Sequence, residues 1–126
     1  MSPSDRESGP AGEGRVDVPR ESKPPYEVER SARHAERAGF RITELQIGPT
    51  QEVPWHVHTV VQDTFFVLQG RIRVQVREPD DEMALGPGEP FTVRARRPHR
   101  VTNAGEGSAV FLVLQGFGDY DFIPAG

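Results

Sequence analysis

Residues 54–70 read PWHVHTVVQDTFFVLQG and contain the most informative pattern of the chain, a His-x-His pair followed by an acidic residue and a glycine. Successive side chains of a β-strand point to opposite faces, so His56 and His58 project from the same face of an extended segment. Neutral imidazole binds Zn, Cu, Fe and Ni, and the carboxylate of Asp63 adds negative charge and an oxygen ligand. This stretch therefore predicts part of a metal site.

A second stretch, residues 88–103, reads GEPFTVRARRPHRVTN and supplies a third histidine, His99. An antiparallel fold can bring it beside the first pair, because topology sets the neighbours of a strand and adjacent strands lie about 4.8 Å apart. Burying three imidazoles and an acid without a partner would cost on the order of several kcal/mol. A bound ion removes that cost, so we predict that His56, His58 and His99 bind one divalent transition metal ion.

Taken together, the two stretches resemble the two sequence motifs of the cupin superfamily. The first motif is a glycine, a His-x-His pair, a Glu and a closing glycine, and the second combines a glycine, a His and an Asn. The resemblance extends from about Phe40 to the C-terminus and implies an all-β cupin double-stranded β-helix, or jelly-roll barrel, in a small single-domain (monocupin) metal-binding protein. The matching positions are Gly48, His56, His58, Asp63, Gly70, Gly88, His99 and Asn103.

The chain departs from these motifs at positions that bear on the site. Asp63 has one methylene fewer than the Glu that the family places there, and Gln62 precedes it. The fourth ligand is therefore Asp63, with Gln62, a water or a mixture as alternatives. Arg94 and Arg96 replace a proline and a glycine, and with Arg97 they form a basic cluster that either faces solvent or binds an anionic group of a ligand.

Composition limits the classes of protein to consider. With 126 residues, 35% of them hydrophobic, the chain is long enough for one domain with one core. A net charge of −4 disfavours a nucleic-acid partner. The absence of cysteine excludes disulfides and thiolate metal sites. No apolar run has the length of a signal peptide or a membrane span, so we expect a cytoplasmic protein that does not contact a membrane.

The organisation of the chain changes near its first prolines. Residues 1–25 are polar and rich in Gly and Pro, which predicts a flexible tail, and residues 26–126 are expected to form a single cupin domain. Residues 31–38 have a weak signal for a helical turn. His34 lies there among charged neighbours and is expected on the surface.

From Phe40 onward, short runs of β-forming residues alternate with turns, as in a sandwich or jelly roll. Residues 40–47 alternate with a parity slip near Glu44, which predicts a bulge. On the His-x-His strand, Val53, Trp55 and Val57 are expected on the face opposite the histidines. The phenylalanines expected in the core are Phe65, Phe66, Phe91 and Phe111, and the acids expected in a C-terminal turn rather than in catalysis are Asp119 and Asp121.

The resemblance and the predicted site together favour an enzyme that uses one metal ion on a small organic molecule. Oxygenase-type (dioxygenase-like) chemistry is the first hypothesis, because a three-histidine site with one weak oxygen ligand leaves positions for substrate and O₂. Non-redox cyclase, isomerase or lyase chemistry, as in polyketide-cyclase-like cupins, is the second, and a non-catalytic small-molecule-binding module is the third. The ion is Fe, Zn, Ni, Mn or Cu.

Assembly is expected to be a homodimer, since a closed twofold pair is the commonest small oligomer. The predicted interface is the stripe Val53, Trp55 and Val57. The alternative is that the N-terminal segment, or the tail from Phe117 to Pro124, covers this stripe within one chain.

Overall fold

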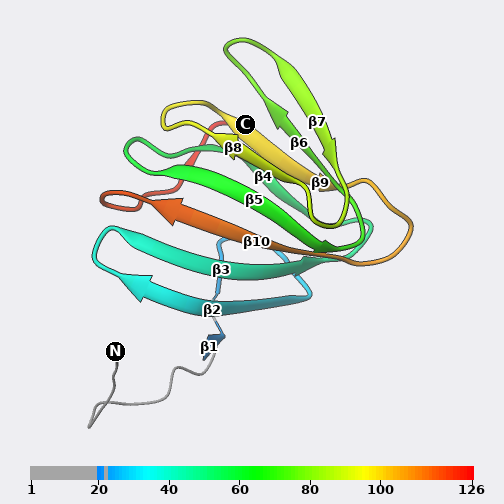
Figure 1. Ribbon diagram of the computed structural model, residues 1–126. Coiled ribbons are helices and arrows are strands. Elements are labelled where there is room, and N and C mark those ends of the chain that lie inside the picture. The colour runs from blue at the N-terminus through cyan, green and yellow to red at the C-terminus, as the bar shows by residue number, and fades with distance from the viewer. Residues whose placement is uncertain (1–19, 22) are drawn as a thin grey trace, which may run out of the picture.

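The computed structural model describes residues 20, 21 and 23–126, and these residues form two antiparallel sheets that pack face to face (Figure 1). The all-β class is therefore confirmed. In spatial order, the first sheet contains β1 (Arg20–Glu21), β2 (Arg30–Arg37), β3 (Phe40–Ile47), β10 (Ala109–Gly116), β5 (Gln62–Gln69) and β8 (Pro90–Val93). The second contains β11 (Ile123–Pro124), β4 (Glu52–Val57), β9 (His99–Asn103), β6 (Ile72–Val76) and β7 (Asp81–Leu85).

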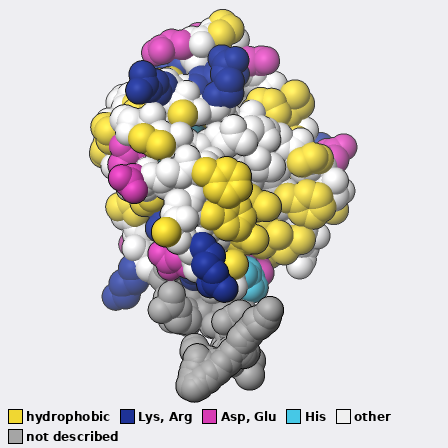
Figure 2. Space-filling view, turned by 60° about the vertical axis from the view of Figure 1, so that its left-hand side comes forward, with side chains coloured by type: hydrophobic (Ala, Val, Ile, Leu, Met, Phe, Trp, Pro, Cys, Tyr) yellow, Lys and Arg dark blue, Asp and Glu magenta, His cyan; other side chains and the backbone are white. Residues whose placement is uncertain are grey.

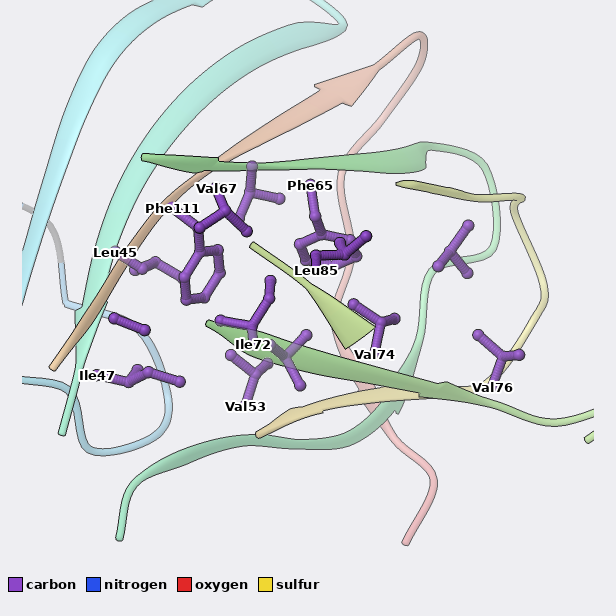
Figure 3. Packing of buried hydrophobic residues seen from close by; sticks show 14 residues of the cluster. Leu45, Ile47, Val53, Phe65, Val67, Ile72, Val74, Val76, Leu85 and Phe111 are labelled. Carbon is purple, nitrogen blue, oxygen red and sulfur yellow. The ribbon is translucent and has the colours of Figure 1, made fainter. Parts of the chain in front are cut away.

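The core lies between the sheets and follows the two-residue period of the strands. Figure 3 shows these side chains pointing toward one another from both sheets. Of the four phenylalanines expected there, Phe65 and Phe111 are buried, Phe91 packs against the cluster, and Phe66 is half-buried outside it. The buried cluster consists of Leu45, Ile47, Val53, Phe65, Val67, Ile72, Val74, Val76, Leu85, Val93, Val101, Ala109, Phe111 and Val113.

The interior of the barrel changes from apolar to polar along its length. On β3, Ile47 and Leu45 belong to the core, whereas Thr43, next along the same face, is a buried polar residue. On β10, the same face passes from Phe111 to the buried Gln115. One end of the barrel is therefore filled by hydrocarbon, and the other holds polar side chains for which partners are needed.

The predicted helical turn over residues 31–38 is wrong, because this segment forms β2. It pairs antiparallel with β3 from Arg30 opposite Gln46 to Arg37 opposite Phe40. The local helical signal was weak, and the hydrogen bonds to β3 and the burial of Ala32 outweigh it. His34 is exposed, as expected, with Nε2 2.7 Å from a carboxylate oxygen of Glu44.

The bulge predicted near Glu44 does not occur in β3 itself; the irregularity lies on its neighbour β2, whose register with β3 shifts between Arg33 and Ala35, opposite Thr43 and Ile42. β3 keeps an unbroken register with β10, from Phe40 opposite Gly116 to Ile47 opposite Ala109. The parity slip in the sequence has another cause: Arg41 and Thr43 occupy the inward face of β3, and the apolar Ile42 lies on the other face. The irregularity therefore marks polar residues inside the barrel.

The outward apolar stripe predicted on β4 does not exist as one face. The pairing of β4 with β9 shifts register between Val53 and His56, so Val53 lies in the core and is only 4% exposed. A bulge adds a residue and reverses the parity of everything beyond it. Trp55 is half-buried, with the Arg77 guanidinium 3.8 Å from its ring centroid, and its carbonyl accepts a hydrogen bond from the Ala125 N–H.

Most of the predicted N-terminal tail, residues 1–19 and 22, lies outside the described residues, so the domain boundary near residue 25 stays a prediction. Within that segment, Arg20 and Glu21 form β1, which pairs with β2. In the part of the chain that the structure describes, no helix is long and apolar enough to span a membrane.

Candidate metal centre

The polar end of the barrel brings together all four residues of the predicted metal site. His56 and His58 come from β4 and the residue after it, Asp63 from β5, and His99 from β9. Their potential ligand atoms all lie within 4.8 Å of one another, and no side chain of the four is more than 3% exposed. Gln62, the alternative to Asp63, is exposed and outside this cluster.

The main chain fixes the orientation of all three imidazole rings. Nδ1 of His56 lies 2.8 Å from the carbonyl oxygen of Pro54, and Nδ1 of His99 lies 2.9 Å from that of Arg97. Nδ1 of His58 lies 2.5 Å from the carbonyl oxygen of Asp121. A carbonyl oxygen can only accept, so each Nδ1 carries the proton and each Nε2 is left for the interior. Such anchoring sets the tautomer of histidines that bind metals.

Asp63 occupies the centre of the cluster. Its Oδ2 is 3.0 Å from Nε2 of His58 and 3.0 Å from Nε2 of His99, and its Oδ1 accepts a hydrogen bond of 2.9 Å from Nε2 of Gln115. Burial works against the charge of this carboxyl group, but the two histidine contacts prevail and hold its pKa below the usual range. Asp63 is therefore a carboxylate, the form in which it can bind a cation.

The histidines differ in their protonation. Burial, followed by the proximity of His99, lowers the pKa of His56 to about 3, so this imidazole is neutral at physiological pH. Burial also opposes the charge of His58, but the hydrogen bond and negative charge of Asp63 outweigh it and raise the pKa of His58. The site thus contains three imidazoles whose Nε2 atoms turn inward, together with one carboxylate. This donor set fits one divalent transition metal ion.

The C-terminal segment covers the cluster from one side. The ring of Phe122 stacks on His56 with centroids 4.4 Å apart and planes at 13°, and the ring of Tyr120 lies 5.4 Å from His58. The Asp121 carboxylate accepts hydrogen bonds from the N–H and the hydroxyl of Thr59, which ties this segment to the loop after β4. Asp121 does not cap a local turn, contrary to the sequence prediction; its side chain binds a loop 62 residues away, and its carbonyl oxygen contacts His58. The aromatic cover itself was not predicted.

The outer surface near this segment is apolar. Exposed large hydrophobic side chains there include Val60 and Phe117, and Phe117, 81% exposed, stacks against Phe40 at a centroid distance of 5.5 Å. Figure 2 shows hydrophobic side chains gathered on the face that includes the end of the barrel where β10 ends. The segment that follows β10 therefore presents apolar side chains to solvent.

Two further polar residues of the site were missed by sequence reasoning, Gln115 and Arg41. Gln115 is the cross-strand partner of Asp63 on one side and of Arg41 on the other. Its Oε1 accepts a hydrogen bond of 2.9 Å from Nε of Arg41. The sequence held two signals, the polar residue that follows the apolar run 109–114 and the parity slip on β3. Both mark strands whose interior face turns polar beside the site.

The basic cluster after β8 does not reach the four ligand atoms. The Arg96 Nε donates to the carbonyl of Thr59, and Arg97 donates to the carbonyls of Arg77 and Pro79. Arg94 is exposed. These contacts hold loops together and favour the solvent-facing interpretation over an anion-binding one.

Fold and site together define a double-stranded β-helix protein with a histidine- and carboxylate-lined centre of the type that holds metals. The family model for the cupin domain matches residues 43–115, which is more than half of the chain. The protein therefore belongs to the cupin family, and the resemblance seen in its motifs is confirmed.

Solved structures agree with this fold. An uncharacterised conserved protein with a double-stranded β-helix domain from Klebsiella pneumoniae superposes with a TM-score of 0.67 at 22% identity, over 75% of this chain and 82% of that one. The oxalate decarboxylase of Bacillus subtilis, which has Mn(II) centres, gives 0.69 at 17% identity, over 78% of this chain and 28% of the enzyme.

An oxalate oxidase gives a TM-score of 0.64 at 17% identity, over 69% of this chain and 46% of that chain. The protein thus spans less than a third of the decarboxylase chain and less than half of the oxidase chain. At these identities the likeness concerns the fold. No curated protein matches the sequence.

Proposed function

We propose that His56, His58, Asp63 and His99 hold one divalent transition metal ion, and that the protein is a metal-dependent enzyme acting on a small organic molecule. The observation that carries this proposal is the common anchoring of the three imidazoles. Each Nδ1 is bound to a main-chain carbonyl, so three Nε2 atoms converge on one carboxylate.

Charge balance supports an ion at this position. With Nδ1 protonated, His58 and His99 could both donate from Nε2 to Asp63 only as imidazolium ions. Two buried positive charges would then face one carboxylate, an arrangement that costs several kcal/mol by order of magnitude. A divalent ion bound by neutral Nε2 atoms replaces those two protons and satisfies the same carboxylate.

Oxygenase-type chemistry is the activity we favour. Three imidazoles and one short carboxylate would hold such an ion without enclosing it, and with iron it would supply O₂-dependent chemistry on a bound substrate. Phe122 and Tyr120 would limit the access of water to that site. Non-redox cyclase, isomerase or lyase chemistry uses the same donor set with Zn or Ni as a Lewis acid. The Mn(II) centres of the oxalate decarboxylase that shares this fold add Mn to the candidate ions.

Metal analysis of the purified protein is the first test. The wild type should bind one equivalent of a divalent ion, and the alanine variants of His56, His58 and His99 should each lose most of it. A full metal complement in all three variants would refute the site. O₂ uptake by the Fe(II)-loaded protein in the presence of candidate substrates then separates the two reaction classes, because the non-redox chemistry consumes no O₂.

A further inference from the structure

A cavity next to the metal centre carries an excess of positive charge. It has a volume of about 210 Å³, and three cationic side chains, Lys23, Arg33 and Arg41, contribute to its lining. No carboxylate lines it. A small cavity of one sign attracts and concentrates ligands of the opposite charge.

Arg41 is the cation of this cavity that hydrogen bonds connect to the metal centre. Its Nε donates to Gln115, which in turn donates to Asp63, so one amide separates the guanidinium from the cluster. Its guanidinium carbon lies 3.3 Å from the ring centroid of Tyr120, which holds its plane in place. Burial lowers the pKa of Arg41, but a guanidinium stays protonated at neutral pH.

The terminal nitrogens of Arg41 have no carboxylate partner among the residues that the structure describes. Arg33, by contrast, is partly neutralised by Glu36, with Nη1 3.1 Å from a carboxylate oxygen. A guanidinium can bind a carboxylate through two parallel N–H···O bonds. Arg41 also shares a side-chain hydrogen bond with Tyr120, but it has the charge for such a pair and no carboxylate already bound to it among the described residues.

The remaining walls offer neutral donors and an apolar side. Thr43 and Tyr26 contribute hydroxyl groups, and Leu45 and Val113 line the apolar side. Burial raises the pKa of Tyr26 above its usual range, so its phenol stays protonated and can donate. A ligand with one anionic head and a small hydrocarbon body matches these walls.

We propose that this cavity binds the carboxylate group of the substrate, with Arg41 as its principal partner, and so places the rest of the molecule toward the metal centre. The inference rests on the proposed function, because it names the class of substrate for that same site. It makes Arg41 a binding residue and the substrate a small organic acid.

The test compares acids with their neutral amides of the same shape. Acetate, benzoate and succinate are titrated into the full-length protein, each beside acetamide, benzamide or succinamide, by NMR. The titrations use metal-free protein first, so that direct coordination to an ion cannot explain binding. At least one acid should bind about tenfold or more tightly than its amide, the factor expected for a charge-assisted pair.

Variants assign the effect to the cavity. Arg41→Gln should abolish the preference for the acid, and Arg41→Lys should keep part of it, because an ammonium retains the charge but not the paired geometry. Arg71→Gln is the matched control, since Arg71 is an exposed arginine that follows the end of β5, whereas Asp63 lies at the start of that strand. It should bind like the wild type.

Three outcomes would overturn the proposal: no acid is preferred over its amide in the wild type, Arg41→Gln keeps the preference, or Arg71→Gln loses it equally. Should Arg41→Gln fail to fold, Arg41→Lys decides, because full wild-type affinity in that variant also contradicts paired binding. Metal binding is measured separately, by titrating the same variants with a divalent ion. An acid preference in a protein that takes up no metal would refute the metal centre alone, whereas metal uptake without an acid preference would refute the cavity alone.

Discussion

Gln115 donates a hydrogen bond of 2.9 Å from Nε2 to Oδ1 of Asp63, its direct cross-strand partner between β10 and β5. The same amide accepts from Arg41 through Oε1. Because a carboxylate can only accept and a guanidinium can only donate, the amide has one possible orientation. Gln115 therefore positions the carboxylate of the metal centre and the cation of the neighbouring cavity at once.

Removing this amide should weaken metal binding without removing a ligand. Gln115→Leu keeps the side-chain size but leaves Asp63 without its anchor, and loss of such a partner typically lowers metal affinity about 10–100-fold. It also leaves a buried acceptor unpaired, which should lower the free energy of unfolding by about 1–3 kcal/mol. A metal titration and a urea denaturation measure the two effects. An unchanged metal affinity would show that Asp63 needs no support from β10.

Asp63 rather than Gln62 should be the fourth ligand. Asp63 is buried among the histidines, whereas Gln62 is exposed on the other face of β5. Asp63→Ala should reduce metal affinity, though less than loss of a histidine, and Asp63→Glu should retain it or tighten it. Gln62→Ala is the neighbouring control and should bind metal like the wild type. The reverse result, with metal lost only in Gln62→Ala, would move the assignment to Gln62.

The metal-free protein should lose stability on acidification below about pH 6.5. His56 has a folded-state pKa of about 3, against 6.5 for an ordinary histidine. Between these values the unfolded chain binds a proton that the folded chain does not, so stability falls as the pH falls, by at most about 1.4 kcal/mol per pH unit. Denaturation of the apoprotein from pH 7 to pH 4 measures the slope, and His56→Gln should flatten it.

The opposite sign applies to His58. Its folded-state pKa is raised, so its contribution is fully present below pH 6.5 and is lost as the pH rises through the folded value. The apoprotein should therefore be most stable near neutral pH. Stability that increases steadily on acidification would contradict the neutral state assigned to His56.

The aromatic cover should contribute both to stability and to metal retention. Phe122→Ala removes the ring stacked on His56 and packed against Tyr26, whose centroid is 5.7 Å away, and should cost about 1–3 kcal/mol in unfolding free energy. It should also speed the release of bound metal to a chelator. Leu68→Ala, at an exposed apolar side chain of β5, is the control and should change neither quantity. Identical release rates in both variants would show that the cover does not restrict the site.

The homodimer stays a prediction, but its interface has to differ from the β4 stripe, which the bulge divides and the C-terminal residues contact. Phe117 is the most exposed of the large hydrophobic side chains that the structure describes. Light scattering should give about twice the chain mass of 14.0 kDa, and Phe117→Ser should lower it. A monomer mass for the wild type at micromolar concentration would refute the dimer.

Much of the site could be predicted because its information is local. The alternation of a strand places His56 and His58 on one side, and the spacing to Asp63 and His99 carries the family pattern. Charge, cysteine content and the regular turns limited the fold class in the same way. Each of these inferences needs only the geometry of a short segment or the composition of the whole chain.

What only the tertiary structure decided depends on pairing between distant residues. Arg41 and Gln115 are 74 residues apart, and Gln115 and Asp63 are 52 apart, so no local pattern joins them into one row. The strand β2 forms because it pairs with β3 through backbone hydrogen bonds. The bulge in β4 changes which side chains face the core, although the alternation of residues in the sequence is regular there. The free-energy differences between local residue preferences are small compared with those from pairing and burying whole strands. The sequence by itself therefore determined the predicted ligand set, whereas the folded chain decided which residues surround it.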